Sequence, residues 1–245
     1  MYDVIVVGAR CGGSPTAMLL AQLGHRVLLV DRASFPSDTV STHLVTLPGV
    51  ARLDRWGLLE RVAASGCPPI SEMTVRLGDV VLRGSPPPVD RVAHQYCVRR
   101  TVLDTILVDA AVDAGAELRE GFAVRDVVFD GDRVAGVRGR GPGGGEVVER
   151  ARLVVGADGL HSLVAEAVEA RRYAERPALT WCCYAYWTGV ALGGAELHVQ
   201  GRRAVSAFPT NDGLACISVA CFFRSAKAAS SFPIGLCTVI LPITS

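Results

Sequence analysis

The chain has 245 residues, half of them hydrophobic, and a formal net charge of +1. This length suits one large domain, or one and a half of ordinary size, and the apolar content excludes a mainly disordered chain. The balanced charge gives no electrostatic reason to expect binding to nucleic acid or to an anionic membrane surface.

The first segment has the pattern of a small β-α-β unit. Residues 3–7 are a β-branched run that predicts a buried strand, and the glycine-rich residues 8–13 follow it. Residues 14–23 predict a helix of small side chains, and residues 26–31 predict a second buried strand. Such an arrangement places the glycine-rich loop between a strand and the start of a helix.

The rest of the chain alternates between helical and strand patterns. The spacing of apolar residues predicts helices over 47–64, 101–114 and 161–170. It predicts a hairpin over 73–82, a meander of short strands over 118–149, a buried strand over 152–155 and aromatic-rich strands over 179–220.

Cysteine usage and apolar stretches bear on the cellular compartment. The eight cysteines form no C-x-x-C pair and have no metal-ligand spacing, so we expect reduced thiols, mostly buried, and no metal site. No secretory signal precedes the first strand, which predicts a cytoplasmic protein. The uncharged residues 228–245 fall short of the ~20 apolar residues that a spanning helix needs, so we expect no membrane anchor.

The loop of residues 8–13 is a candidate site for a dinucleotide. Gly8, Gly12 and Gly13 would let the backbone approach a pyrophosphate at the helix N-terminus, although Arg10 replaces the usual middle glycine. Asp31 ends the next strand, 23 positions after Gly8, where an acid can accept the hydroxyls of an adenosine ribose. The alternative is a tight strand-to-helix turn that binds nothing.

A second candidate lies at Asp158. The run Gly156-Ala157-Asp158-Gly159 follows a buried strand and precedes a helix, so the carboxylate is presented where ligands collect in open α/β sheets. The alternative is that Asp158 caps the helix that follows, and the two roles can coexist.

These segments resemble the FAD-dependent oxidoreductases of the para-hydroxybenzoate hydroxylase type. The resemblance rests on residues 3–13 with Val30-Asp31-Arg32, on residues 155–162, and on Arg99-Arg100-Thr101-Val102-Leu103-Asp104. That superfamily includes aromatic-ring monooxygenases, geranylgeranyl reductases and flavin-dependent halogenases. It implies an α/β fold, with a Rossmann-like FAD/NAD(P)-binding domain and an interleaved, incomplete antiparallel β-sheet substrate domain. We assign residues 1–72 and 98–176 to the first domain and residues 73–97 and 177–221 to the second.

The resemblance implies FAD as cofactor, NAD(P)H as electron donor and a set of cofactor-binding residues. Arg100 would lie near the phosphate or ribityl region, unless it is a surface arginine paired with Asp104; Arg99 would be its solvated neighbour. Asp158 would lie near the pyrophosphate and take part in handling NAD(P)H, and the strand of Val124 would bring backbone groups to the adenine. The implied cofactor-binding set is Gly8, Ala9, Arg10, Gly12, Gly13, Asp31, Arg32, Arg100, Val124 and Asp158.

No side chain is assigned a catalytic role. His43 lies on a loop that runs beneath the flavin in the superfamily, but a polar loop histidine explains it equally well. The aromatic residues Trp181, Tyr184, Tyr186 and Trp187 could form the floor of a substrate pocket, or simply belong to the core.

The implied function is an NAD(P)H-using monooxygenase that hydroxylates an apolar or aromatic small molecule. The alternatives are an isoprenoid reductase of the geranylgeranyl type, and a non-catalytic FAD-binding remnant. The remnant is considered because no Gly-Asp-Ala segment, the third FAD motif of these proteins, occurs in the sequence. Residues 222–245 contain Lys227, the single lysine of the chain, and no acidic residue, so we expect a non-homologous tail of the kind that a frameshift or premature end produces.

Overall fold

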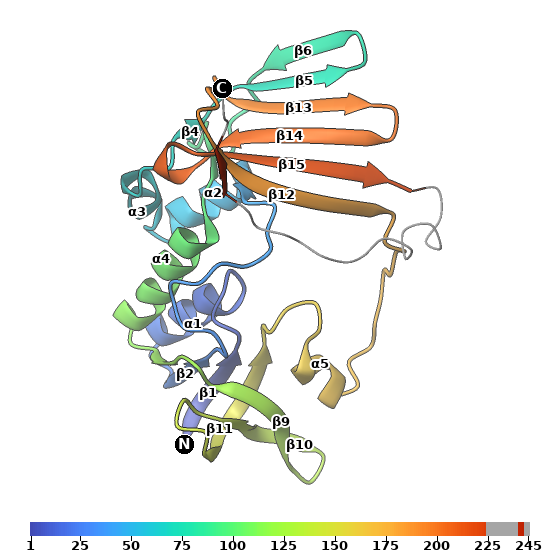
Figure 1. The fold of residues 1–245 in the computed structure, drawn as a ribbon. Coiled ribbons are helices and arrows are strands. Elements are labelled where there is room, and N and C mark those ends of the chain that lie inside the picture. Colours follow the sequence, from blue (N-terminus) through green and yellow to red (C-terminus); the bar gives the residue numbers. More distant parts are fainter. Residues whose placement is uncertain (224–239, 243–245) are drawn as a thin grey trace. The chain divides into compact units, whose positions relative to one another are not determined.

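The computed structural model describes residues 1–223 and 240–242. The chain divides into two compact units, one formed by Met1–Thr39 and Arg100–Tyr173, the other by Val40–Arg99 and Ala174–Ser245 (Figure 1). Each unit has its own sheet, and the chain passes between them more than once. The predicted α/β class with two interleaved parts is confirmed, although the large sheet of the second unit is mixed, with two parallel pairings among its antiparallel ones.

The first unit is built on a six-stranded sheet in the order β8-β2-β1-β11-β10-β9. Strand β11 pairs in parallel with β1 through its second half and antiparallel with β10 through its first half. Residues Val4–Val7 of β1 and all of β2 are buried, as their apolar sequences predict, whereas Leu153 of β11 is 52% exposed. The strands are β1 (Tyr2–Val7), β2 (Val27–Val30), β8 (Glu117–Arg119), β9 (Ala123–Asp130), β10 (Arg133–Arg140) and β11 (Glu146–Gly156).

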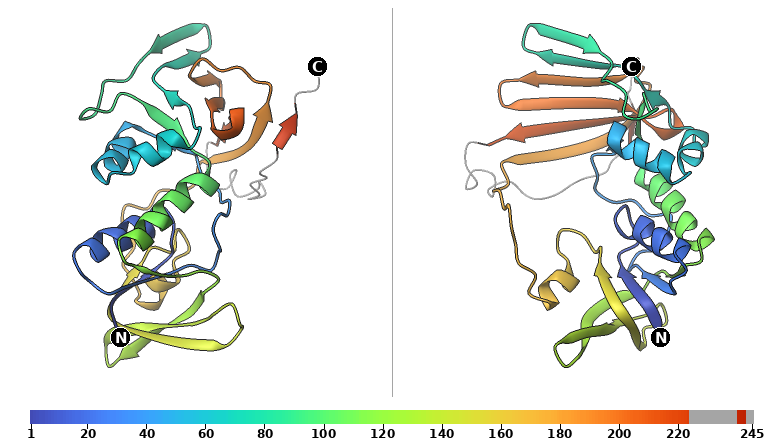
Figure 2. Two further views of the ribbon diagram at one scale, coloured as in Figure 1. Left: turned by 90° about the vertical axis from the view of Figure 1, so that its left-hand side faces the viewer. Right: turned by 180° about the vertical axis from the view of Figure 1, so that it is seen from behind.

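Three helices belong to this unit: α1 (Gly13–Gln22), α4 (Arg100–Asp113) and α5 (Leu163–Ala167). Helices α1 and α4 lie side by side in both views of the ribbon (Figures 1 and 2). Strand β1 contributes Ile5 and Val7 to a core that also contains Leu28 and Val137. This packing fixes the carboxyl end of β1 against the neighbouring strands of the sheet.

The second unit is built on a seven-stranded sheet in the order β16-β12-β15-β14-β13-β5-β6. Antiparallel pairing aligns Tyr186 of β12 with Cys216 of β15. The hairpin of β5 and β6 forms one edge (Figure 2). The strands are β5 (Met73–Leu77), β6 (Val80–Gly84), β12 (Thr180–Thr188), β13 (Ala195–Gln200), β14 (Arg203–Pro209), β15 (Ala215–Phe222) and β16 (Ile240–Pro242).

The described residues of the second unit also form a three-stranded sheet, two α-helices and a short 3-10 helix at Asn211–Gly213. Strand β7 (Gln95–Cys97) lies between β3 (Leu44–Val45) and β4 (Pro69–Ile70), and the helices are α2 (Leu47–Arg55) and α3 (Leu59–Ala64). Because β3 and β4 both pair with β7, residues 40–72 belong to the same compact unit as β7. The sequence-based boundaries assigned these residues to the FAD-binding domain, so the compact units and the predicted domains differ here.

Several element boundaries differ from their predictions for local reasons. The helix predicted over 47–64 is two helices, interrupted where Gly57 adopts φ +72°. The helix predicted over 161–170 is limited to α5, because Ser162 caps its start and Glu169 adopts φ +51° after its end. In the predicted tail, Phe222 belongs to β15, and Ile240–Pro242 form β16, which pairs in parallel with β12. Most of the tail lies outside the described residues.

Two general expectations can be compared with the structure. No helix within residues 1–223 and 240–242 has both the length and the apolar character needed to cross a bilayer. No disulfide joins the seven cysteines in the described part of the chain, but only Cys67, Cys97 and Cys216 are buried, fewer than predicted.

Candidate functional site

The loop between β1 and α1 is held in shape by two glycines. Gly8 has φ +99°, and a Cβ atom there would lie 2.4 Å from the Ala157 carbonyl oxygen. A Cβ atom at Gly13 would lie 1.7 Å from the Gly8 carbonyl oxygen. Neither position can accept a side chain, so both glycines are required for the close packing of β1, α1 and the end of β11.

Asp31 anchors the same loop from the end of β2. Its carboxylate accepts hydrogen bonds from the Ala9 amide at 2.7 Å and from the Ala33 amide at 2.8 Å. The residue is 9% exposed. Each carboxylate oxygen can accept a second hydrogen bond, so this anchoring leaves acceptor capacity for a ligand hydroxyl.

The N-terminus of α1 has the features of a phosphate-binding site. Gly12, its N-cap residue, is exposed, and a Cβ atom there would meet only the Ala157 Cβ atom, at 3.9 Å. Within the described residues no side chain caps the helix, and its first turn contains no acidic residue. The amides and the helix dipole therefore favour an anion at this end, which fits the pyrophosphate of a dinucleotide.

Arg10 and Arg100 share the carboxylate of Asp104, which is completely buried. Arg10 Nη1 lies 2.5 Å from Asp104 Oδ2, and Arg100 donates from Nε and Nη2 to Oδ1 at 3.0 and 2.8 Å. Arg10 also donates to the Ser37 hydroxyl at 3.0 Å. The pairing of Arg100 with Asp104 is the alternative raised from the sequence, but Arg100 is 11% exposed and so is not a surface residue.

Asp158 lies at the start of α5 and binds its first turn. Its carboxylate accepts hydrogen bonds from the Leu163 amide at 2.7 Å and from the Ser162 hydroxyl at 2.5 Å. Ser162 in turn accepts a hydrogen bond from the Ala165 amide. The capping role expected as the alternative for Asp158 is therefore present in the structure. It does not exclude a ligand, because the two roles can coexist.

Arg32 and Val124 are the remaining members of the predicted set in this unit. Arg32 directly follows β2 with Asp31 and is exposed. Val124 lies in β9, where it is half-buried and packs against the core. Their roles stay predictions.

The second unit contains a buried polar cluster that the sequence did not predict. His43 is 2% exposed and Tyr186 is fully buried, and the Tyr186 hydroxyl lies within hydrogen-bond distance of His43 Nε2. His43 Nδ1 lies 2.8 Å from the Ser41 carbonyl oxygen, and the His43 backbone adopts φ +60°. Tyr184 packs edge-on against the imidazole with ring centroids 4.7 Å apart. Non-glycine residues with such backbone angles are concentrated at functional sites.

Arg99 joins this cluster, which corrects the prediction that it is solvated. Its guanidinium carbon lies 4.9 Å from the centroid of the Tyr186 ring, and Nη1 donates to Asp212 at 3.0 Å. The Arg99 amide donates to the Asn211 side chain at 3.0 Å. The side chain is 19% exposed, because the aromatic face and the 211–213 turn cover it. Adjacent positions in the sequence, 99 and 100, thus serve different units.

Comparison with known proteins identifies the family. Residues 1–223 match the family described as FAD binding domain. The chain belongs to this family. The match extends from residue 1 to residue 223, so it includes the 8–13 loop, Arg100 and Asp158, and FAD is the cofactor of the family.

Curated relatives of this FAD-binding chain come from archaea and bacteria. It is 31% identical over 174 residues to digeranylgeranylglycerophospholipid reductase 2 of Methanothermobacter thermautotrophicus, a match that covers 67% of this chain and 41% of the relative. It is 27% identical over 233 residues to protein FixC of Escherichia coli O157:H7, covering 89% of this chain and 48% of FixC. The chain therefore spans less than half the length of these relatives.

Solved structures give the same fold. The myxobacterial chondrochloren halogenase CndH, an FAD-dependent halogenase, superposes with a TM-score of 0.79 and 27% identity, covering 96% of this chain and 55% of CndH. PqsL, a probable FAD-dependent monooxygenase from Pseudomonas aeruginosa, superposes with a TM-score of 0.74 and 23% identity, covering 94% of this chain and 62% of PqsL. The second likeness concerns the fold alone.

Proposed function

We propose that this FAD-binding chain belongs to an oxidoreductase that uses NAD(P)H and hydroxylates an apolar or aromatic small molecule. The observation that carries the FAD part is the open N-terminus of α1, where Gly12 faces no side chain that would block a phosphate. The monooxygenase part is supported by the likeness in fold to PqsL. When bound, FAD supplies the redox chemistry of such an enzyme.

Each residue of the first unit has a defined task in this proposal. The amides of the 8–13 loop bind the pyrophosphate, with Gly12 as the point of closest approach. Asp31 binds the adenosine ribose through its remaining lone pairs, next to Arg32. Asp104 positions Arg10 and Arg100. Its buried carboxylate binds Nε and Nη2 of Arg100, and the remaining Nη1 group is the part of this guanidinium that would bind the cofactor.

Two further residues complete the proposed cofactor site. Asp158 accepts a hydrogen bond from the first turn of α5 and places a carboxylate near the end of β11. The neighbouring Ala157 carbonyl packs closely against Gly8 of the loop. The backbone of Val124 in β9 contacts the adenine. Both proposals are supported by the position of these residues in the same compact unit as the loop.

The proposed substrate site is the aromatic cluster of the second unit. Tyr184, Tyr186 and His43 combine apolar ring surface with polar atoms that can orient a small molecule. The Tyr186 hydroxyl and His43 Nε2 would hold a proton between them, next to the cationic Arg99. The aromatic rings of this cluster favour an aromatic or apolar substrate.

A reductase that adds hydrogen to isoprenoid double bonds is the second candidate. It is favoured by the identity of 31% to a digeranylgeranylglycerophospholipid reductase. The third candidate is an FAD-binding protein without catalysis. Reduction of the flavin separates the third candidate from the other two. All three bind flavin, but only in a catalytic chain does NADPH or NADH bleach the flavin absorbance.

Oxygen use separates the first two candidates. With NAD(P)H and an aromatic test substrate, a monooxygenase consumes oxygen in proportion to NAD(P)H oxidised, whereas a reductase oxidises NAD(P)H with its olefin under anaerobic conditions. NADPH-dependent reduction of an isoprenoid without oxygen would overturn the monooxygenase assignment and leave the FAD assignment standing.

A further inference from the structure

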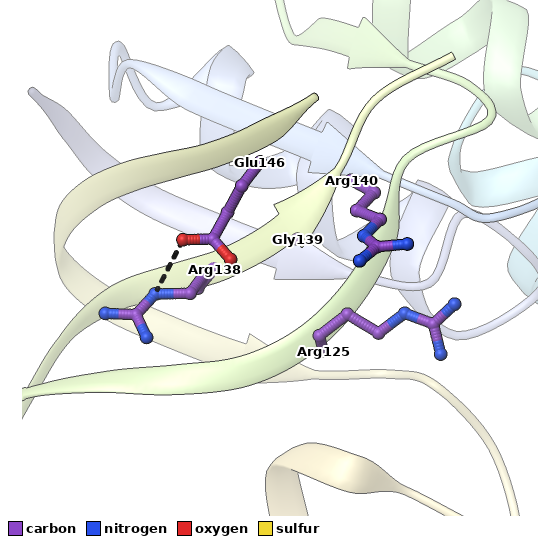
Figure 3. Close-up of a pocket in the computed structure, with 5 residues that line it drawn as sticks. All are labelled: Arg125, Arg138, Gly139, Arg140 and Glu146. Atoms are coloured by element: carbon purple, nitrogen blue, oxygen red, sulfur yellow. Dashed lines mark ion pairs between the residues drawn. The ribbon is translucent and has the colours of Figure 1, made fainter. Parts of the chain in front are cut away.

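A surface cleft in the first unit gathers three arginines outside the proposed FAD site. It has a volume of about 420 Å³ and is lined by Arg125, Arg138, Gly139, Arg140 and Glu146 (Figure 3). These residues come from β9, β10 and the start of β11. None of them belongs to the cofactor-binding set proposed above.

An irregularity in the sheet creates the cleft. Gly139 pairs with Val124 and Arg138 pairs with Asp126, so Arg125 is an extra residue in β9 at a register shift. As a result Arg125 and Asp126 are both exposed, which regular alternation along a strand would not give. The bulge thus directs Arg125 to the face that carries Arg138 and Arg140.

The floor of the cleft is backbone. A Cβ atom at Gly139 would lie 2.6 Å from the Ala123 carbonyl oxygen and 2.6 Å from the Phe122 ring, so no side chain fits there. Glycine at this position keeps β9 and β10 close together beneath the arginines. The missing Cβ would point toward the buried Phe122, so Gly139 contributes only its backbone to the cleft, between the exposed Arg138 and Arg140.

The charges in the cleft do not balance. Arg138 pairs with Glu146 at 3.7 Å, while Arg125 and Arg140 extend together toward the other side (Figure 3). Among the described residues no carboxylate forms an ion pair with Arg125 or Arg140. Asp126 does not line the cleft, and its carboxylate accepts a hydrogen bond from the Val127 amide. Two neighbouring guanidinium groups therefore lack a counter-ion, in a chain whose net charge is only +1.

We propose that this cleft is a second anion site, which binds a phosphate group through Arg125 and Arg140. Guanidinium groups bind phosphate oxygens through two parallel hydrogen bonds, and two of them match a dianionic phosphate. The phosphate can be carried by a soluble molecule or by a lipid headgroup, since both present the same chemistry to the cleft.

Calorimetric titration with inorganic pyrophosphate at low ionic strength tests the site. It is done in a Gly12→Ala background, so that the loop before α1 does not contribute. Arg125→Ala and Arg140→Ala should each weaken binding by about tenfold, and the lysine variants should weaken it less, because they keep the charge but lose the paired hydrogen bonds. Arg150→Ala, an exposed arginine on β11 outside the cleft, should bind as the parent does.

Two sources of phosphate are then compared. ADP and vesicles containing phosphatidic acid are titrated against the same variants, and the probe whose binding depends on Arg125 and Arg140 identifies the source. Equal binding by parent and arginine variants, or no binding of any probe, overturns the proposal. In chains that keep Gly12, Arg125→Ala and Arg140→Ala should leave FAD affinity unchanged, which separates failure of this site from failure of the FAD site.

Discussion

Asp104, buried in α4, binds Arg10 of the loop after β1 at 2.5 Å, across 94 positions of sequence. The same carboxylate binds Arg100 at the start of its own helix. One acid therefore connects the glycine-rich loop with α4. It also explains why an arginine is accepted at position 10, where the usual fingerprint has glycine: its side chain is directed away to Asp104 and Ser37.

Replacing this acid should destabilise the first unit. Asp104→Asn removes the negative charge between two arginines in a fully buried position, so the free energy of unfolding should fall by about 3 kcal/mol. Denaturant unfolding measures the change. Asp109→Asn, on the exposed side of the same helix, is the matched control and should stay within about 0.5 kcal/mol of the parent. Equal effects of the two variants would contradict the central role of Asp104.

Substitutions at two glycines of the loop should distinguish an effect on folding from an effect on cofactor binding alone. Gly13→Ala places a Cβ atom 1.7 Å from the Gly8 carbonyl oxygen, so it should lower the free energy of unfolding by about 2 kcal/mol or more and abolish FAD binding. Gly12→Ala meets nothing closer than 3.9 Å and should leave stability unchanged. Its methyl group nevertheless occupies the approach to the helix N-terminus, so FAD affinity should fall by about tenfold or more.

Unfolding and FAD titration on the same two samples check this pair. Normal FAD affinity in Gly12→Ala would mean that the pyrophosphate does not contact the start of α1.

Asp31 should contribute to FAD binding both directly and through the loop. Asp31→Ala removes the acceptor of the Ala9 and Ala33 amides as well as the proposed ribose contact, so FAD should bind about tenfold or more weakly. Asp38→Ala, in the same unit but without these bonds, is the control. Fluorescence titration provides the measurement. An unchanged dissociation constant in Asp31→Ala would show that the ribose lies elsewhere.

The Tyr186 hydroxyl should contribute to the stability of the second unit and, in the proposed substrate site, to substrate binding. Tyr186→Phe keeps the ring but removes the hydrogen bond with His43, which should cost about 1 kcal/mol of stability. If the cluster binds substrate, KM should rise in Tyr186→Phe while FAD affinity stays normal. Tyr173→Phe changes a tyrosine that is 84% exposed and should alter neither quantity. A parent-like KM and stability in Tyr186→Phe would exclude both roles.

The buried thiol of Cys67 predicts that the free energy of unfolding decreases at alkaline pH. Burial raises the pKa of Cys67 from 9.0 to about 12, so the folded chain retains a proton that the unfolded chain loses. The resulting stabilisation is complete below about pH 9 and disappears as the pH rises toward about 12.

The measurement is denaturant unfolding at about pH 8 and about pH 10.5. The parent should lose more stability between these values than Cys67→Ala does, and Cys221→Ala should resemble the parent. The same loss in the parent and in Cys67→Ala would contradict this assignment.

The sequence predicted the local features of the site better than its long-range contacts. The glycine-rich loop, the spacing to Asp31 and the presentation of Asp158 follow from short patterns, because strand, turn and helix signals are local. The alternatives noted for Arg100 and Asp158 are also local, an i,i+4 pair and a helix cap, and both occur in the structure. The fold class followed from the same patterns.

What the sequence did not predict depends on tertiary pairing. His43 and Tyr186 are 143 positions apart, and nothing near either residue indicates the other. Arg99 looked like a solvated neighbour of Arg100 because helix spacing says nothing about a turn at 211–213 that covers it. The grouping of residues 40–72 with the second unit depends on the pairing of β3 and β4 with β7, two-residue strands too short to leave a pattern.

The most direct measurement of the central claim is a flavin titration of the purified chain, followed by absorbance and by quenching of flavin fluorescence. The account predicts saturable binding of one FAD, with flavin absorbance retained after gel filtration in the parent chain and lost in Gly12→Ala. A chain that stays colourless after incubation with FAD and leaves flavin fluorescence unquenched would contradict it.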